Sequence, residues 1–254
     1  MKTTHHIILS SSYSLGKRIC VDFYDNTDFN SAIKKIINKC GSDVSLSIHI
    51  IQTDSKDWKS VTKDNPFWTD VMKFDIVDKF IETIKKDRTL TALDVTKYII
   101  SKVQCTHLKL QKLLYLCYAQ YLLNHNKKLF EGETICALPK GPIVSSICDR
   151  YGGQNNVVCE KSRDKIEIND TEQILGKKSM ILPSRSRILF AEDGSMKVFS
   201  IDKTLETYND MTANDLVNLT HKKDSPWSIV RNRNNGWGVI EDEDIFNYHK
   251  NEIE

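Results

Sequence analysis

The sequence lacks the common signatures of nucleotide binding and of the main hydrolase classes. No glycine-rich phosphate loop, no G-x-G-x-x-G fingerprint, no G-x-S-x-G elbow and no H-E-x-x-H motif occurs in its 254 residues. Its seven histidines and seven cysteines match no common zinc spacing, and no C-x-x-C pair is present. We therefore expect no catalytic residues, no metal and no cofactor, and a protein that is not an enzyme.

Long hydrophobic runs are also missing. No stretch reaches 18 uncharged apolar residues, and the apolar run in the opening MKTTHHIILSSS is too short for a signal peptide. The odd number of cysteines favours buried free thiols in a reducing compartment over a disulfide framework. We expect a cytoplasmic protein without a membrane partner.

A strong charge of one sign is absent as well. The 36 basic and 34 acidic residues give a net charge of +2, and the charges are interspersed in short pairs such as Lys85-Lys86. This pattern is typical of solvated helix faces. It neither requires nor excludes nucleic-acid binding.

The first third of the chain is predicted to form a small α/β unit. Short runs of alternating or continuous apolar residues surround one segment with helical spacing, which predicts the order β-β-α-β. We expect residues 1–87 to form an accessory domain in which 52–75 is a connecting loop that packs down through Trp58 and Trp68. The strands are expected at His6–Leu9, Arg18–Tyr24 and Val44–Ile51, and the helix at Phe29–Ile37.

The remainder, residues 88–254, is predicted to be mainly helical, so that the whole chain falls in the α+β class. Capping patterns at Thr91 and Thr106 precede helices, and a wide apolar stripe runs from Leu110 to Leu122. Residues 154–200 contain short β-like runs. Within them Asp193-Gly194 stands between alternating hydrophobic residues, which predicts a β-hairpin insertion. The Gly141-Pro142 pair is expected in the first turn of a helix.

Two local patterns leave a choice between a structural and a functional role. Cys105 and His107 resemble a thiol beside a base, but residues two apart at a helix start point in different directions, which favours a structural thiol. His221 follows a short capped helix, where it either bonds a helix-end carbonyl or belongs to a recognition surface. Its spacing favours the structural role.

Four motifs in the C-terminal part resemble the Panacea-domain, SocA-like antitoxin family, a group with many phage-associated bacterial members. The resemblance covers about 91–254. A departure is Pro139-Lys140, where the family commonly has an aromatic residue before the glycine. The similar segments are THLKLQKLLYLCYAQYLL at 106–123, Lys128 to Glu131, Ala137 to Val144 with its Gly141-Pro142 pair, and Leu219-Thr-His221 followed by Ser225-Pro-Trp227; Ile240 and Ile245 match the final helix.

The resemblance implies an antitoxin of a toxin–antitoxin system, which neutralises a cognate protein toxin by direct binding. Such binding needs a complementary surface with a few aromatic or basic anchors. The predicted partner-binding residues are Lys109, Lys112, Tyr115, Lys140, His221 and Lys222, and the residues expected to maintain the fold are Gln111, Gly141, Pro142, Ser225, Pro226 and Trp227.

Three alternatives stay open at this point. The protein could be a proteolytic adaptor that delivers a toxin to a AAA+ protease, which is a role found within the same family. It could repress its own operon by binding operator DNA. From the enzyme class, it could be a cysteine-dependent hydrolase. The segments 1–87 and 154–200 lie outside the minimal family domain, and we expect one of them to set partner choice.

Overall fold

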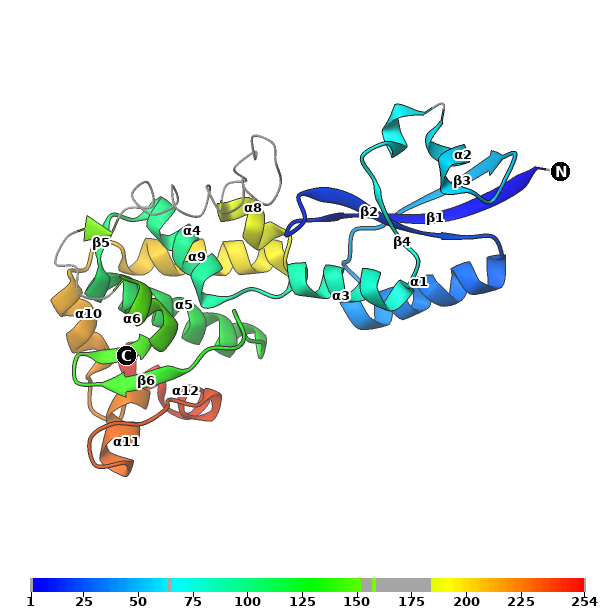
Figure 1. Cartoon of the computed structure of the whole chain (residues 1–254). Coiled ribbons are helices and arrows are strands. Elements are labelled where there is room, and N and C mark those ends of the chain that lie inside the picture. The colour runs from blue at the N-terminus through cyan, green and yellow to red at the C-terminus, as the bar shows by residue number, and fades with distance from the viewer. Residues whose placement is uncertain (1, 64, 152–156, 159–183, 254) are drawn as a thin grey trace. The chain divides into compact units, whose positions relative to one another are not determined.

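The computed structural model describes residues 2–63, 65–151, 157–158 and 184–253. The chain divides into two compact units, whose elements are labelled in Figure 1. Unit 1 consists of Met1–Thr89 and Phe190–Asp193, and unit 2 of Leu90–Leu189 and Gly194–Glu254. The predicted class is confirmed, because the structure is mixed α+β with a small N-terminal sheet and a helical C-terminal region.

Unit 1 is built on a four-stranded sheet in the order β3-β1-β2-β4. The central strand β1 pairs antiparallel with β2 and β3, and β2 pairs parallel with β4. The predicted order β-β-α-β is therefore confirmed for the first four elements of the unit, and the structure adds β4 as a further strand. The strands are β1 (Thr3–Ser12), β2 (Lys17–Phe23), β3 (Ser47–Thr53) and β4 (Met72–Phe74).

Both faces of this sheet are covered, because the side chains of β1 alternate between two cores. Ile8 packs with helices α1 (Asn26–Cys40) and α3 (Val77–Arg88) on one face. Ile7 and Leu9 pack on the other face against Trp68 and its neighbours. As expected, the segment 52–75 packs down through Trp58 and Trp68, but it is more than a loop, since it forms the second cover of the sheet. It contains α2 (Trp58–Thr62), the short 3-10 helix η1 (Pro66–Trp68) and β4.

Unit 2 is organised around helix α5 (His107–His125), which is buried on almost every side. Every residue from Leu110 to Ala119 is buried. Helices α4, α6, α9, α10 and α12 and strand β7 all pack against it. The other elements are α4 (Ala92–Lys102), β5 (Cys105–Thr106), β6 (Ile135–Leu138), β7 (Gly141–Val144), α6 (Ser145–Tyr151), β8 (Val157–Val158), α8 (Ser184–Leu189), α9 (Gly194–Tyr208), α10 (Ala213–Thr220), α11 (Pro226–Arg233), α12 (Asp242–Tyr248) and α13 (Lys250–Ile253).

The predicted hairpin around Asp193-Gly194 is wrong, because these residues join helix α8 to helix α9. Asp193 takes the left-handed turn, with φ 54, and Gly194 begins α9. A Cβ on Gly194 would lie 2.4 Å from the carbonyl oxygen of Ile188, so the pair serves a tight turn between helices. The buried residues of α9 recur at helical spacing over its full length, which a five-residue window could not distinguish from a period of two. Of the other β-like runs, Val157–Val158 forms β8, and those at 166–168 and 180–182 lie outside the described residues.

The Gly141-Pro142 pair is also placed differently from the prediction. It opens strand β7, which pairs antiparallel with β6 through a tight turn at Pro139-Lys140. The helix begins only at Ser145. This small hairpin positions the site described next.

Candidate functional site

Two buried polar side chains on α5 hold the backbone of β7. Gln111 is fully buried, and its side-chain amide both accepts from the backbone N–H of Val144 at 2.8 Å and donates to the carbonyl of Val144 at 3.3 Å. Lys112 is also fully buried, and its Nζ donates to the carbonyl of Pro142 at 2.7 Å. Because buried backbone groups need partners, these two side chains fix the hairpin against the helix.

Gly141 lies where β7 approaches Lys112 most closely. Its φ is 101, a conformation that favours glycine. A Cβ there would stand 2.7 Å from Nζ of Lys112 and 3.0 Å from Oγ1 of Thr220. Only a residue without a side chain therefore lets α5, β7 and the end of α10 meet at this point.

The Thr220 to Trp227 segment joins the same cluster. Ser225 donates from Oγ to the carbonyl of Thr220 at 3.0 Å and accepts from the N–H of Ser228 at 3.2 Å, which caps α11. Trp227 donates from Nε1 to the carbonyl of Leu138 on β6 at 2.7 Å. His221 stacks on the Trp227 ring with 3.7 Å between centroids and 8° between planes. Residues far apart in the sequence thus form one constellation, which we call the Lys112 cluster: Gln111, Lys112, Gly141, Pro142, Thr220, His221, Ser225 and Trp227.

Burial dominates the electrostatics of this cluster. It lowers the pKa of Lys112 to about 7, despite the opposing effect of the Glu252 carboxylate. It also lowers the pKa of the half-buried His221, and the positive charges of Lys112 and Arg231 add to that effect. Lys112 is therefore a polar group of the core whose charge is disfavoured by the fold.

The structure changes the view of two predicted partner-binding residues. The expectation that Lys112 and Tyr115 lie at the surface is wrong, because both are fully buried. Tyr115 donates from its hydroxyl to the buried carboxylate of Glu252, at 3.1 and 3.2 Å from the two oxygens. The buried surface of α5 is wider than the apolar stripe from Leu110 to Leu122 suggested, because neighbouring elements cover the helix on nearly all sides.

The other four candidates are accessible to different degrees. Lys140 and Lys222 are exposed, and Lys109 and His221 are half-buried. Lys109 donates from Nζ to the carbonyl of Asn209 at 2.5 Å, which ties α5 to the end of α9. Their role in partner binding stays a prediction.

Sequence reasoning missed a second buried group beside the cluster. Glu252 and His249 are fully buried, and the carboxylate lies 2.5 Å from Nδ1 of His249. Gln120 on α5 meets Nε2 of the same ring at 3.2 Å. Burial raises the pKa of Glu252, while His249 and Tyr115 oppose that shift. The only signal was the i, i+3 spacing of His249 and Glu252, which is too common near a chain end to predict burial.

Four buried cysteines, Cys20, Cys40, Cys105 and Cys117, have a raised pKa because burial disfavours the thiolate. Burial raises the pKa of Cys20 to about 12 and that of Cys105 to about 11. A thiol with such a pKa holds its proton at neutral pH and is a poor nucleophile. Cys105 with His107 is therefore a structural pair of residues. Among the described residues no group of three His, Cys, Asp or Glu side chains is placed to hold a metal ion.

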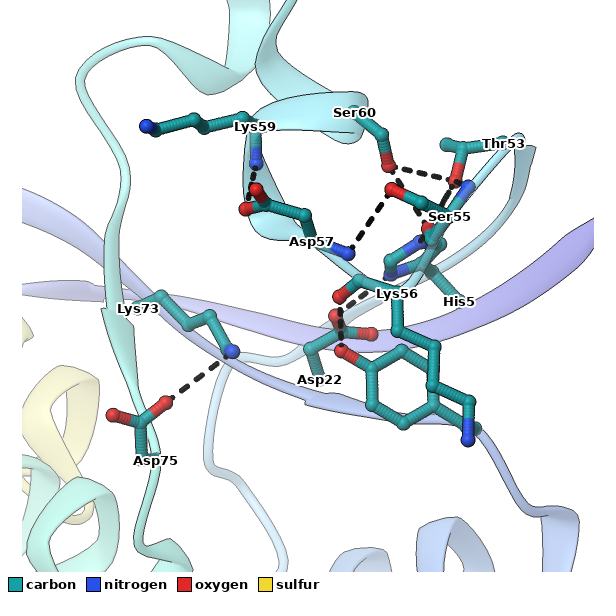
Figure 2. Close-up of polar contacts among 11 residues, drawn as sticks. His5, Asp22, Thr53, Ser55, Lys56, Asp57, Lys59, Ser60, Lys73 and Asp75 are labelled. Atoms are coloured by element: carbon teal, nitrogen blue, oxygen red, sulfur yellow. Dashed lines mark hydrogen bonds and ion pairs between the residues drawn. The ribbon is translucent and has the colours of Figure 1, made fainter.

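Unit 1 contains an acid–histidine–hydroxyl arrangement that the sequence did not reveal (Figure 2). Nδ1 of the buried His5 lies 2.7 Å from the Asp22 carboxylate, and Nε2 lies 3.0 Å from both Oγ1 of Thr53 and the carbonyl of Ser55. Thr53 itself donates to the Ser55 carbonyl and accepts from Ser60, each at 2.7 Å. Their positions in the chain, 17 and 48 residues apart, gave no warning of this contact.

This arrangement stabilises the fold of unit 1 and is not suited to nucleophilic attack. A carbonyl oxygen only accepts, so the Nε2 that faces Ser55 carries a proton and is not free to remove one from Thr53. The Thr53 proton is already directed at the same carbonyl. The triad geometry of a hydrolase requires the opposite polarity. His5 and Asp22 therefore tie β1 and β2 to the turn that follows β3.

The segment that contains the Lys112 cluster is similar to one known protein family. The family model for the antitoxin SocA-like, Panacea domain matches residues 110–228, which confirms the resemblance over that segment. The match supports an antitoxin role, points to a non-enzymatic function and suggests a protein partner such as a toxin.

The other comparisons add no relative. No curated protein and no solved structure matches the chain significantly. Among the described residues, no helix has the length and apolar character that crossing a membrane requires.

Proposed function

We propose that this protein is the antitoxin of a toxin–antitoxin pair and neutralises its cognate protein toxin by binding it directly through unit 2. The observation that carries the proposal is the family match over 110–228, which spans the Lys112 cluster from α5 to Trp227. Neutralisation by binding needs no reaction chemistry, only a surface complementary to the toxin.

The surface beside the Lys112 cluster is our candidate for the toxin-binding face. Trp227 is stacked with His221, and the Arg231 guanidinium lies 5.1 Å from the centre of its ring. Lys140 projects from the β6–β7 turn, whose Leu138 carbonyl accepts from Trp227. Lys222 follows directly after His221. This combination of an aromatic anchor and nearby cations is typical of residues that dominate binding energy.

The direct test is co-expression with the product of the neighbouring toxin gene, followed by co-purification. We expect growth to be rescued and the two proteins to purify as a complex. The charge-reversal pair Lys140→Glu and Lys222→Glu should weaken the complex by about tenfold or more, since rim charges steer association and exclude wrong partners. The matched control is Lys17→Glu with Lys86→Glu, two exposed lysines of unit 1.

Two results would overturn the proposal. Rescue without any complex would exclude neutralisation by direct binding. A toxin half-life that shortens when this protein is present, and recovers in a protease-deficient host, would instead identify a proteolytic adaptor.

We further propose that residues 1–87 act as an accessory domain and 88–254 as the Panacea-like domain. One shared domain that meets different toxins needs an element that discriminates among them. A chimera that carries the first 87 residues of a homologue and retains its original toxin preference would exclude this role for the N-terminal domain.

A further inference from the structure

Strand β3 forms one edge of the unit 1 sheet. In the described part of the chain it pairs only with β1, so its outer row of backbone N–H and C=O groups faces away from the sheet. Its seven residues, SIHIIQT, contain no charge and no proline. Natural proteins usually protect an edge of this length with charge, proline, a bulge or a cover. The opposite edge follows that rule, because β4 has three residues and carries Lys73.

The two faces of β3 differ in how they are covered. His49 points to the face covered by η1, where its ring contacts Phe67 and Trp68. Ile48 and Ile50 point to the opposite face and are 54% and 65% exposed. They share that face with Ile8, the buried residue directly across from Ile48 on β1. The apolar pattern of a core strand thus continues onto an edge that the helical layer leaves open.

Helix α1, which lies on the same face of the sheet as Ile8, also carries apolar side chains that are not fully buried. Lys35 and Lys39 of α1 reach Asp78 on α3. Ile33 and Ile37 precede these two lysines by two residues each, which is a rotation of about 200° around the helix axis. They therefore face away from α3. Since α3 lies on the β4 side, they face the β3 side of the sheet. Ile37 is 39% exposed.

We propose that β3 is a self-association surface, at which a second copy of this chain adds its own β3 in antiparallel register. The strand is self-complementary about His49. A two-fold axis there places Ile48 opposite Ile50 of the second copy and Ile50 opposite its Ile48, so that four isoleucines meet on one face. Because the strand has no charge, no like charges meet across the axis. This pairing joins two four-stranded sheets into one of eight strands and is independent of toxin neutralisation.

The experiment is the oligomeric state of the full chain, measured by sedimentation over a micromolar concentration series. We expect a concentration-dependent dimer. The double substitution Ile48→Lys and Ile50→Lys should raise its dissociation constant more than about tenfold, because it removes the apolar pairs and places like charges opposite one another. Both side chains are exposed in the single chain, so the variant should keep the thermal unfolding midpoint of the unpaired protein.

Met72→Lys is the matched control, because Met72 is 45% exposed at the other edge of the same sheet. It should leave the dimer unchanged. Hydrogen exchange gives a second readout, in which the β3 amides that point away from β1 should be protected in the dimer and exchange faster in the double variant. A wild-type monomer at every concentration, a dimer that survives the double substitution, or equal weakening by Met72→Lys would each refute the proposal.

Discussion

Lys112 makes the stability of this protein depend on pH in a direction that can be derived from its position. The side chain is fully buried between α5 and β7, where its pKa falls to about 7 from an ordinary value of 10.5. A pKa shift of one unit corresponds to ~1.4 kcal/mol. Keeping the charge on Lys112 in the folded state therefore opposes folding by up to about 5 kcal/mol. The hydrogen bond to Pro142 offsets part of this cost in either protonation state.

The sign follows from counting protons. Between about pH 7 and 10.5 the unfolded chain keeps a proton on Lys112 that the folded chain has released, so the unfolded state binds more protons and stability rises with pH. Below pH 7 both states hold the proton, and this contribution becomes constant. Over the two units above neutrality, the free energy of unfolding should therefore rise by about 2 kcal/mol from this residue.

The assay is urea unfolding of the wild-type protein and of Lys112→Met at intervals from pH 7 to 9, under reducing conditions. Methionine has a similar length and does not titrate, so the difference between the two proteins isolates Lys112, while the buried thiols contribute equally to both. Lys109→Met is the control for losing a lysine from a half-buried position on the same helix. Parallel pH profiles for the wild-type protein and Lys112→Met would refute this reasoning.

Three further substitutions test the contacts of the two units. Gly141→Ala should lower the free energy of unfolding by about 2 to 4 kcal/mol in chemical denaturation, because the new Cβ meets Lys112 in a positive-φ conformation; a change below about 0.5 kcal/mol would show that the hairpin yields easily. Ser225→Ala should lower it by about 1 to 2 kcal/mol through loss of the α11 cap, which thermal unfolding measures against Ser228→Ala as a neighbouring control. Asp22→Ala should cost about 1 to 3 kcal/mol, because it leaves the buried Nδ1 of His5 without its hydrogen-bond partner, and unchanged stability would show that this contact does not hold β1 to β2.

The resemblance to the Panacea family was readable from the sequence because its motifs are local. The helix from Thr106, the Gly141-Pro142 pair and the Ser225-Pro-Trp227 element each show a cap, a turn or a spacing that a few neighbouring residues dictate. The β-β-α order of unit 1 was readable for the same reason, since periods of two and of 3.6 are visible within each run. The prediction of a hairpin at Asp193-Gly194 failed because the short flanking runs fitted a period of two as well as a period of 3.6. The prediction of a helix start at Gly141-Pro142 failed because this pair is equally compatible with the start of a strand.

The candidate site depended on contacts between distant parts of the chain. Nothing local distinguishes Lys112, which lies in the core, from Lys109, which reaches the surface three residues earlier on the same helix. The two lysines differ in burial because β7 and α10 cover one side of α5. Only the tertiary fold determines which side is covered. The same holds for His5, which meets Asp22 and Thr53 through strand pairing.

The sequence by itself determined the α+β class, the helical unit with its family motifs, and most of the capped helix starts, because these arise from interactions within a few residues. Only the tertiary structure decided which polar residues are buried, that three of the four motifs converge on one cluster, and that β3 forms an edge of its sheet. Burial, charge cost and edge exposure are properties of what surrounds a residue in space, and the surroundings are supplied by segments that lie far away along the chain.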